Sequence, residues 1–178
     1  MSKLVKISAL TVILAAFGAN AADQGQGVVN FKGTVVDSPC GIAAESADQS
    51  IDFGQISKSA LSSGGTSLQK KLDIKLTKCD AAALTKGVQV TFSGNTISSV
   101  DEGTSTPVLT ELATSGPTNT AVVINNGSDI KFGTATDFIS IATGDNNLQF
   151  QTWVKQATGK TVAAGDFTAV TNFHLNYQ

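Results

Sequence analysis

The sequence contains no arginine, since all twelve of its basic residues are lysine. Its formal net charge at pH 7 is -2, and charged residues make up only 15% of the chain, against about a quarter in an average soluble protein. Without arginine there is no guanidinium group for bidentate binding of phosphate or carboxylate. Without a basic excess there is little electrostatic attraction for nucleic acid. We therefore expect no nucleic-acid partner.

Residues suited to catalysis or metal binding are also scarce. His174 is the single histidine, and with Cys40 and Cys79 it falls short of a four-ligand zinc set. The acidic pair Asp101-Glu102 and the separate Asp145 have no partner histidine and fit solvated loop charges. No G-x-S-x-G, P-loop or H-E-x-x-H sequence occurs. The sequence therefore predicts no enzymatic activity, no cofactor and no metal site.

Long apolar runs are absent except at the N-terminus. Residues 7–18 are almost entirely apolar, follow two lysines and precede the Ala-Asn-Ala sequence at 19–21. The run is about a dozen residues long, short of the roughly 20 that span a bilayer as a helix. The pattern is typical of a secretory signal peptide, residues 1–21, that is cleaved between Ala21 and Ala22. We expect the remaining chain to be exported.

Cys40 and Cys79 are the only cysteines. In an exported protein two cysteines most simply form one disulfide, which an oxidising compartment preserves. Closing a loop of about 40 residues stabilises a fold by roughly 4 kcal/mol on the chain-entropy model.

Apolar residues alternate with polar ones in several short segments that are separated by glycine, serine and threonine clusters. This period of two predicts strands, and about eight of them in one domain indicate an antiparallel sandwich. Asn126-Gly127 predicts a hairpin turn, and residues 57–61 a short helical turn. The expected strands cover residues 68–76, 88–92, 120–124, 130–132 and 148–154, and the expected loops cover 62–65, 93–96 and 103–107.

The C-terminal segment shows the clearest alternation in the chain. From residue 167 onward one face is apolar and includes Phe173, Leu175 and Tyr177, whereas His174 lies on the polar face. Chain termini fray unless they are held, so this apolar face must be covered. The covering strand belongs either to the same domain or to another chain.

A second alternating segment lies close to the predicted cleavage site. Gly27, Val29 and Phe31 share one face of an extended strand, and Gly33 then marks a bend. The segment before Gly33 is either an ordinary first strand of its own domain or an arm that reaches another chain. After Gly33, we expect residues 34–36 to enter the core and Cys40 to fix them there.

Several motifs recur together in one known family. They are GxVxFKGTVVDSPC at residues 27–40, ADQSIDFGQIS at 47–57, LDIKLTKC at 72–79 and a last strand with Gly165 before it and Tyr177 penultimate. In their order and spacing the chain resembles the major rod subunits of chaperone–usher pili, the type 1 and P-pilus family of Gram-negative bacteria.

This resemblance implies an all-β fold, an incomplete immunoglobulin-like sandwich that lacks its last strand. It implies that residues 22–33 form an N-terminal donor-strand extension and residues 34–178 the pilin domain. Subunits of this kind polymerise by strand addition to an open sheet edge. By the resemblance, Gly27, Val29 and Phe31 face the groove of a neighbouring subunit.

The resemblance also assigns roles at the other end of the chain. Phe173, Leu175 and Tyr177 line the edge of the subunit's own groove, Gly165 lies near the start of the last strand, and Gln178 carries the carboxylate that a periplasmic chaperone contacts. The implied partners are identical or homologous pilin subunits, this chaperone and the outer-membrane usher. The implied route runs through the periplasm to an extracellular pilus on the cell surface.

Three function classes follow. The first is a structural rod subunit that forms a homopolymer and supports cell adhesion. The second is a minor or adaptor pilin that joins the rod to a tip adhesin. An adhesin itself carries an extra receptor-binding domain, for which the mature chain leaves no room. The third, a secreted enzyme, has no catalytic constellation to support it.

Overall fold

The computed structural model describes residues 27–100 and 107–178, with the side chains of 98–100, 107 and 108 left out. The chain divides into two compact units, Met1–Val35 and Val36–Gln178. The predicted signal peptide with its Ala21–Ala22 cleavage site, and the pair Asp101-Glu102, lie outside the described residues. In the part of the chain that is described, no helix has the length and apolar character to cross a membrane.

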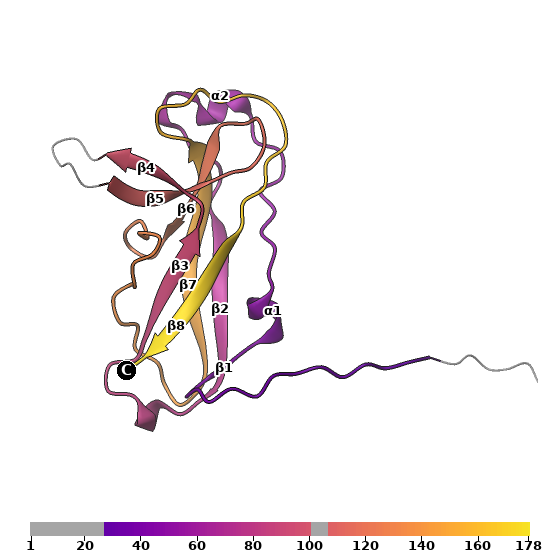
Figure 1. The fold of residues 1–178 in the computed structure, drawn as a ribbon, viewed down its shortest axis with the longest axis vertical. Helices are drawn as coiled ribbons and strands as arrows, with labels where there is room; N and C mark the ends of the chain where they lie inside the picture. The colour runs from indigo at the N-terminus through magenta and orange to yellow at the C-terminus, as the bar shows by residue number, and fades with distance from the viewer. Residues whose placement is uncertain (1–26, 101–106) are drawn as a thin grey trace, which may run out of the picture. The chain divides into compact units, whose positions relative to one another are not determined.

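The larger unit is mostly β-structure with a few short helical segments (Figure 1). Its strands are β1 (Gly41–Ile42), β2 (Lys70–Cys79), β3 (Val88–Gly94), β4 (Thr96–Val100), β5 (Pro107–Ala113), β6 (Thr120–Asn125), β7 (Gly144–Gln156) and β8 (Thr171–Tyr177). Its helical segments are α1 (Ala44–Ala47), α2 (Lys58–Leu61), η1 (Ser62–Gly64) and η2 (Ala81–Ala83). The expected helical turn at residues 57–61 is confirmed as α2.

The strands form two antiparallel sheets of unequal size. The larger sheet has six strands in the order β1-β2-β7-β6-β5-β4, and the smaller one contains only β3 and β8. In Figure 1 the β3–β8 pair lies in front of β2 and β7. This arrangement confirms the predicted immunoglobulin-like sandwich, and its smaller sheet is too narrow to cover the larger one.

The core lies between the two sheets. Phe92 of β3 meets Phe150 of β7 edge-on, with ring centroids 5.2 Å apart, a favourable geometry for aromatic pairs. Alternate side chains of each strand point into this layer, which confirms the expected strands at 88–92, 120–124 and 148–154. The buried side chains include Leu72, Ile74 and Leu76 in β2, Val88, Val90 and Phe92 in β3, Val122 and Ile124 in β6, and Leu148, Phe150 and Val154 in β7.

The expectation that residue 68 joins this core is wrong. Strand β2 begins at Lys70, and Leu68 is 85% exposed. The reason lies at Ser67, whose N–H donates to the Val154 carbonyl at 2.8 Å and whose hydroxyl accepts from the Val154 N–H at 2.9 Å. The Ser67 hydroxyl thus takes the place of a main-chain acceptor in the pairing with β7. The alternation of buried and exposed side chains is therefore interrupted before β2 begins.

The expected entry of residues 34–36 into the core is also wrong. Val35 and Val36 are exposed, and residues 27–36 carry no strand assignment. The buried core begins only at Cys40, which is 2% exposed.

The three strands β1, β4 and β5 were not predicted from the sequence. Where a loop was expected at 93–96, Asn95 alone separates β3 from β4; of the loop expected at 103–107, residues 103–106 lie outside the described residues and Pro107 begins β5. β4 pairs with β5, and the Ala113 N–H donates to the Asn95 carbonyl at 2.7 Å. The Asn126-Gly127 turn is confirmed, with Gly127 at φ +81°, although the buried residues Ile130 and Phe132 that follow it form no regular strand.

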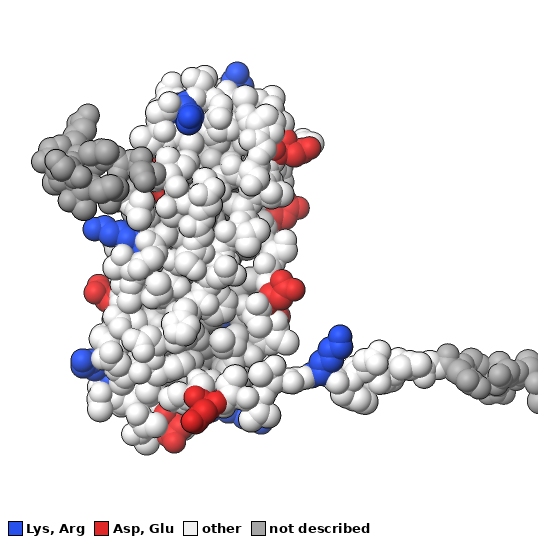
Figure 2. Space-filling view, viewed as in Figure 1, with Lys and Arg blue, Asp and Glu red and all other residues white. Residues whose placement is uncertain are grey.

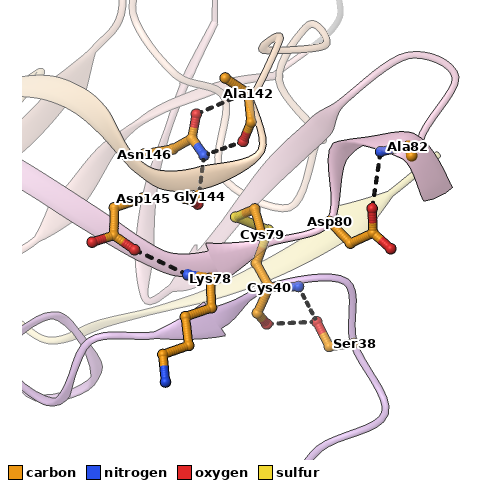
Figure 3. Close-up of a disulfide and its surroundings, with 10 residues drawn as sticks. All are labelled: Ser38, Cys40, Lys78, Cys79, Asp80, Ala82, Ala142, Gly144, Asp145 and Asn146. Carbon is orange, nitrogen blue, oxygen red and sulfur yellow. Dashed lines mark hydrogen bonds between the residues drawn. A yellow bond between two sulfur atoms is a disulfide. The ribbon is translucent and has the colours of Figure 1, made fainter.

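The expected disulfide is present between Cys40 and Cys79 (Figure 3). It joins the start of the domain to the end of β2. Beside it, Lys78 has a positive φ of 49°, and its N–H donates to an Asp145 carboxylate oxygen at 3.0 Å. Asp145 is therefore a structural acceptor at the start of β7 rather than a free loop charge.

An ion pair with a buried carboxylate lies in the larger sheet. The Glu111 side chain of β5 is only 4% exposed and is 2.8 Å from Lys155 Nζ of β7. The hydroxyl and the N–H of Thr158 donate to the two Glu111 oxygens at 2.6 and 3.0 Å. Burial alone would raise the pKa of Glu111, but these hydrogen bonds and the lysine charge outweigh it and hold the pKa below the ordinary value of 4.5.

Replacing this carboxylate by an amide, Glu111→Gln, should destabilise the fold at neutral pH by on the order of 1–3 kcal/mol, because a buried charge-assisted network loses its charge. A depressed folded-state pKa adds stability above about pH 4.5 that is lost as the pH falls through the folded-state value. We therefore expect the difference between variant and parent to shrink at acidic pH. Denaturant unfolding at pH 7 and pH 3 of the subunit complexed with a peptide of residues 22–33 measures it.

Glu45→Gln is the matched control. Glu45 pairs with Lys75 at 3.4 Å, but both side chains are more than half exposed, so solvent screens the pair. We expect no measurable change in stability for this variant. An equal effect of the two substitutions would contradict the role given to burial.

Candidate functional site

The last strand, β8, presents an apolar face that the domain covers only in part. β8 pairs with β3, placing Phe173 opposite Phe92 and Leu175 opposite Val90. Phe92 and Val90 are at most 1% exposed, whereas Phe173, Leu175 and Tyr177 remain half-buried. His174 is exposed on the opposite face, as predicted. The apolar alternation of β8 is therefore confirmed, and part of its face remains open.

The open face of β8 forms one wall of a groove of about 720 Å³. Residues 167–173 line this wall, and residues 46–51 with Phe53 line the opposite wall. Its floor is mainly apolar and draws on both sheets: Leu72, Phe92, Leu112, Val122, Ile124 and Thr152. A strand-shaped apolar segment would therefore contact the centre of the core from this groove.

The groove continues past the start of β8 into a second section of about 550 Å³. The two sections share Ile51, Phe53 and Phe167, and the rings of Phe53 and Phe167 are 6.4 Å apart. The second section adds the apolar side chains of Ile56, Leu61 and Val162, with Asp52, Lys58 and Asp166 among its charged residues.

The main chain of both walls has free hydrogen-bonding capacity. Within the described residues, β8 pairs with β3 alone, and residues 48–56 make no main-chain to main-chain hydrogen bond. Backbone groups without partners seek them when water is removed. A strand placed between the walls could therefore pair on both of its edges.

Gly165 lies in the lining of the second section, before β8. Its φ of +148° favours glycine, and a Cβ there would lie 2.6 Å from Pro117 Cγ. A side chain at this position would displace the proline ring. This contact is the physical reason for glycine at the predicted position near the last strand.

Tyr177 and Gln178 lie beyond the lining residues of the groove. Burial raises the pKa of the Tyr177 phenol, and a hydrogen bond with Ser38 only partly offsets this. The phenol therefore stays neutral at physiological pH. Gln178 follows β8, and its main chain bonds to the segment that precedes β3.

The predicted donor residues belong to the other compact unit, Met1–Val35. Val29 is 73% exposed and Phe31 90% exposed, and Gly27 has no atom within 4 Å of the position of a Cβ. Their backbone carries no regular secondary structure. An apolar face of this kind is a ready partner for an apolar groove.

The sequence identified one wall of the groove but not the other. Phe173 and Gly165 contribute to the lining, whereas Leu175 shares the same face of β8 but lies outside the lining. The opposite wall, with Ile51 and Phe53, was named only as part of a family motif. Their spacing of two residues was the available signal, but no strand is assigned there.

The described residues contain no group of three or more histidine, cysteine, aspartate or glutamate side chains placed to hold a metal ion. Charged side chains are scattered over the face shown in Figure 2 and leave wide areas without charge. The groove offers apolar contact and main-chain hydrogen bonds, which are the means of binding an extended peptide segment.

Comparison with known proteins gives concordant results. Residues 29–178 match the model of the fimbrial protein family. The chain is 49% identical to the PRS fimbrial major pilin protein of Escherichia coli over 166 residues, 90% of this chain and all of the relative.

Solved structures agree. A structure of a chaperone–usher pilus matches 87% of this chain and 97% of its own at 43% identity and a TM-score of 0.75. The P pilus rod subunit PapA matches 79% of this chain and all of its own at 40% identity and a TM-score of 0.67. The protein is therefore a structural pilin that belongs to the fimbrial protein family.

Proposed function

We propose that this pilin polymerises by donor-strand exchange, in which residues 22–33 of one copy fill the groove of the next. The observation that carries the proposal is an apolar groove between two walls with free main-chain groups, in a chain that also carries an exposed alternating segment. The groove fits an extended strand, and the chain carries a segment with the matching apolar alternation.

The alternation of the arm fits the chemistry of the groove. Burying Val29 and Phe31 contributes roughly 1.5–3 kcal/mol each, and each main-chain hydrogen bond adds about 1 kcal/mol. Gly27 suits a place where the groove is too shallow for a side chain. Val28 is on the other face of such a strand and would stay outside the groove.

The similarity to major pilins favours the rod over a minor or adaptor position. The PRS and Pap major pilin proteins are 49% and 41% identical to this chain, and PapA is described as a rod subunit. We infer an extracellular homopolymer that supports cell adhesion as the shaft of a pilus.

The apolar groove also has to be covered before the subunit is assembled into a fibre. An uncovered apolar sheet edge pairs with other chains and aggregates. We infer that a periplasmic chaperone fills the groove with a strand of its own and contacts the Gln178 carboxylate, and that the outer-membrane usher catalyses its replacement by the next subunit's arm. The inferred division is a signal peptide at 1–21, the arm at 22–33 and the pilin domain at 34–178.

The paired substitution Val29→Asp with Phe31→Asp should abolish polymerisation, because two carboxylates would have to be desolvated in an apolar groove. Deleting residues 23–31 should have the same effect, while the subunit still folds on its chaperone. Electron microscopy of surface fibres and gel separation of undissociated polymers measure the outcome.

Val28→Asp is the matched control, because it adds a carboxylate at the residue next to Val29, on the opposite face of the strand. We expect fibres of normal length from it. Normal polymerisation of the Val29/Phe31 variant or of the deletion variant would overturn the donor-strand assignment.

The mature subunit expressed without a chaperone should aggregate or be degraded, because the groove remains open. Soluble yield after size-exclusion chromatography measures this. Co-expression of a strand donor, such as a peptide with the sequence of residues 22–33, should restore soluble protein. Abundant stable monomer from a chain without its arm and without any donor would count against an incomplete fold.

A further inference from the structure

The arm has an outward face that the filling of an apolar groove does not use. Lys32 is the one charged residue in the described part of the arm, residues 27–35, and its side chain is exposed. Because side chains alternate along an extended strand, Lys32 points outward when Phe31 points into a groove. An ammonium group therefore lies at the rim of the groove that the arm fills.

The rim of the groove carries negative charge. In the wall opposite β8, Ile51 and Phe53 are half-buried and line the groove, whereas Asp52 between them is exposed. The charged residues of the lining are three carboxylates and one ammonium group: Asp48, Asp52, Asp166 and Lys58. The wall formed by residues 167–173 has no charged side chain. The arm and the rim are therefore complementary in charge.

Among these carboxylates, Asp52 is the best placed for a contact with the arm. Its neighbours Ile51 and Phe53 line both sections of the groove, so Asp52 lies beside the middle of the groove rather than at one end. Its Oδ1 accepts the Gly54 N–H at 2.7 Å, which orients the carboxylate. Neither ion pair within the described residues involves Asp52. Its charge is therefore available to a cation from another chain.

We propose that Lys32 of the incoming arm pairs with Asp52 of the receiving subunit and thereby fixes the register of the donor strand. The pair rests on the proposed function, because it exists only between an arm and the groove that the arm fills. With Phe31 in the groove beside Ile51 and Phe53, Lys32 and Asp52 lie on the same outward face of adjacent extended segments, where opposite charges attract. A slip of one residue turns Lys32 inward and desolvates its charge. A slip of two residues moves the ammonium group by about 7 Å.

The pair acts on the rate of assembly more than on its strength. Both groups are exposed before the arm binds and keep contact with water at the rim, so the pair adds little to the stability of the filled groove. Complementary charge at the rim of an interface steers association, and salt screens this attraction. Lys32 is thus a positioning residue, and its charge has its largest effect at low ionic strength.

The test measures how fast a donor peptide enters the groove. The acceptor is the chaperone-bound chain with Val29→Asp and Phe31→Asp, which keeps its groove but donates no strand. The donor is a fluorescent peptide of residues 22–36, long enough to separate Lys32 from the terminal carboxylate of the peptide. We expect Lys32→Glu to slow entry about tenfold at low ionic strength. In 1 M salt, where the Debye length is about 3 Å, the difference should fall below about twofold.

Substitutions in the acceptor identify the partner of Lys32. Asp52→Lys should restore the rate of the Lys32→Glu peptide and slow the parent peptide. Asp137→Lys is the matched control, because it changes the net charge equally at an exposed residue outside the groove lining, and it should give no rescue. Asp52→Asn keeps an oxygen for the Gly54 N–H and removes only the charge. In that acceptor, Lys32→Gln should no longer change the rate of entry.

The outcomes separate this pair from the donor-strand function. Equal rates of entry for the parent and Lys32→Glu peptides at low ionic strength would overturn the pair and leave the donor strand intact. Equal rescue by Asp137→Lys would also overturn it, because the attraction would then depend on net charge alone. Failure of the parent peptide to enter the groove at any ionic strength would overturn both proposals.

Discussion

The mismatch in width between the two sheets is the constraint on which the rest of the structure depends. Six strands on one side require an apolar cover that a pair of strands, β3 and β8, cannot provide. The uncovered area becomes the groove beside Phe173, and its floor is the centre of the core itself. Filling the groove therefore completes the fold, so association and folding draw on the same burial of apolar surface.

The frame around the groove is held from several sides. The Cys40–Cys79 disulfide joins the start of the domain to the end of β2, and the ion pair of the buried Glu111 with Lys155 joins β5 to β7. At the far end of β8, three N–H groups hold the Gln178 oxygen. These contacts allow a domain with an open core to keep the geometry of its groove walls.

The chemistry of the groove explains the composition of the chain. Recognition of an extended strand draws on apolar contact and main-chain hydrogen bonds, neither of which needs arginine, histidine or metal ligands. A groove floor of Leu72, Val122 and Ile124 gains its affinity by excluding water. The low content of charged residues in the chain therefore suits a groove that binds an extended strand through apolar contact.

The sequence by itself determined the elements whose signal is local. The alternation in β3, β7 and β8 specified their buried faces, and two cysteines in an exported chain specified their bond. Tertiary structure alone decided the β4–β5 pairing, the exposure of Leu68 and the burial of Glu111. It also decided the second wall of the groove and the hydrogen bonds from residues 85–87 to Gln178. These features depend on contacts between groups far apart in the chain, such as Ser67 with Val154 or Gly87 with Gln178. The periodicity of a local segment does not predict such long-range contacts.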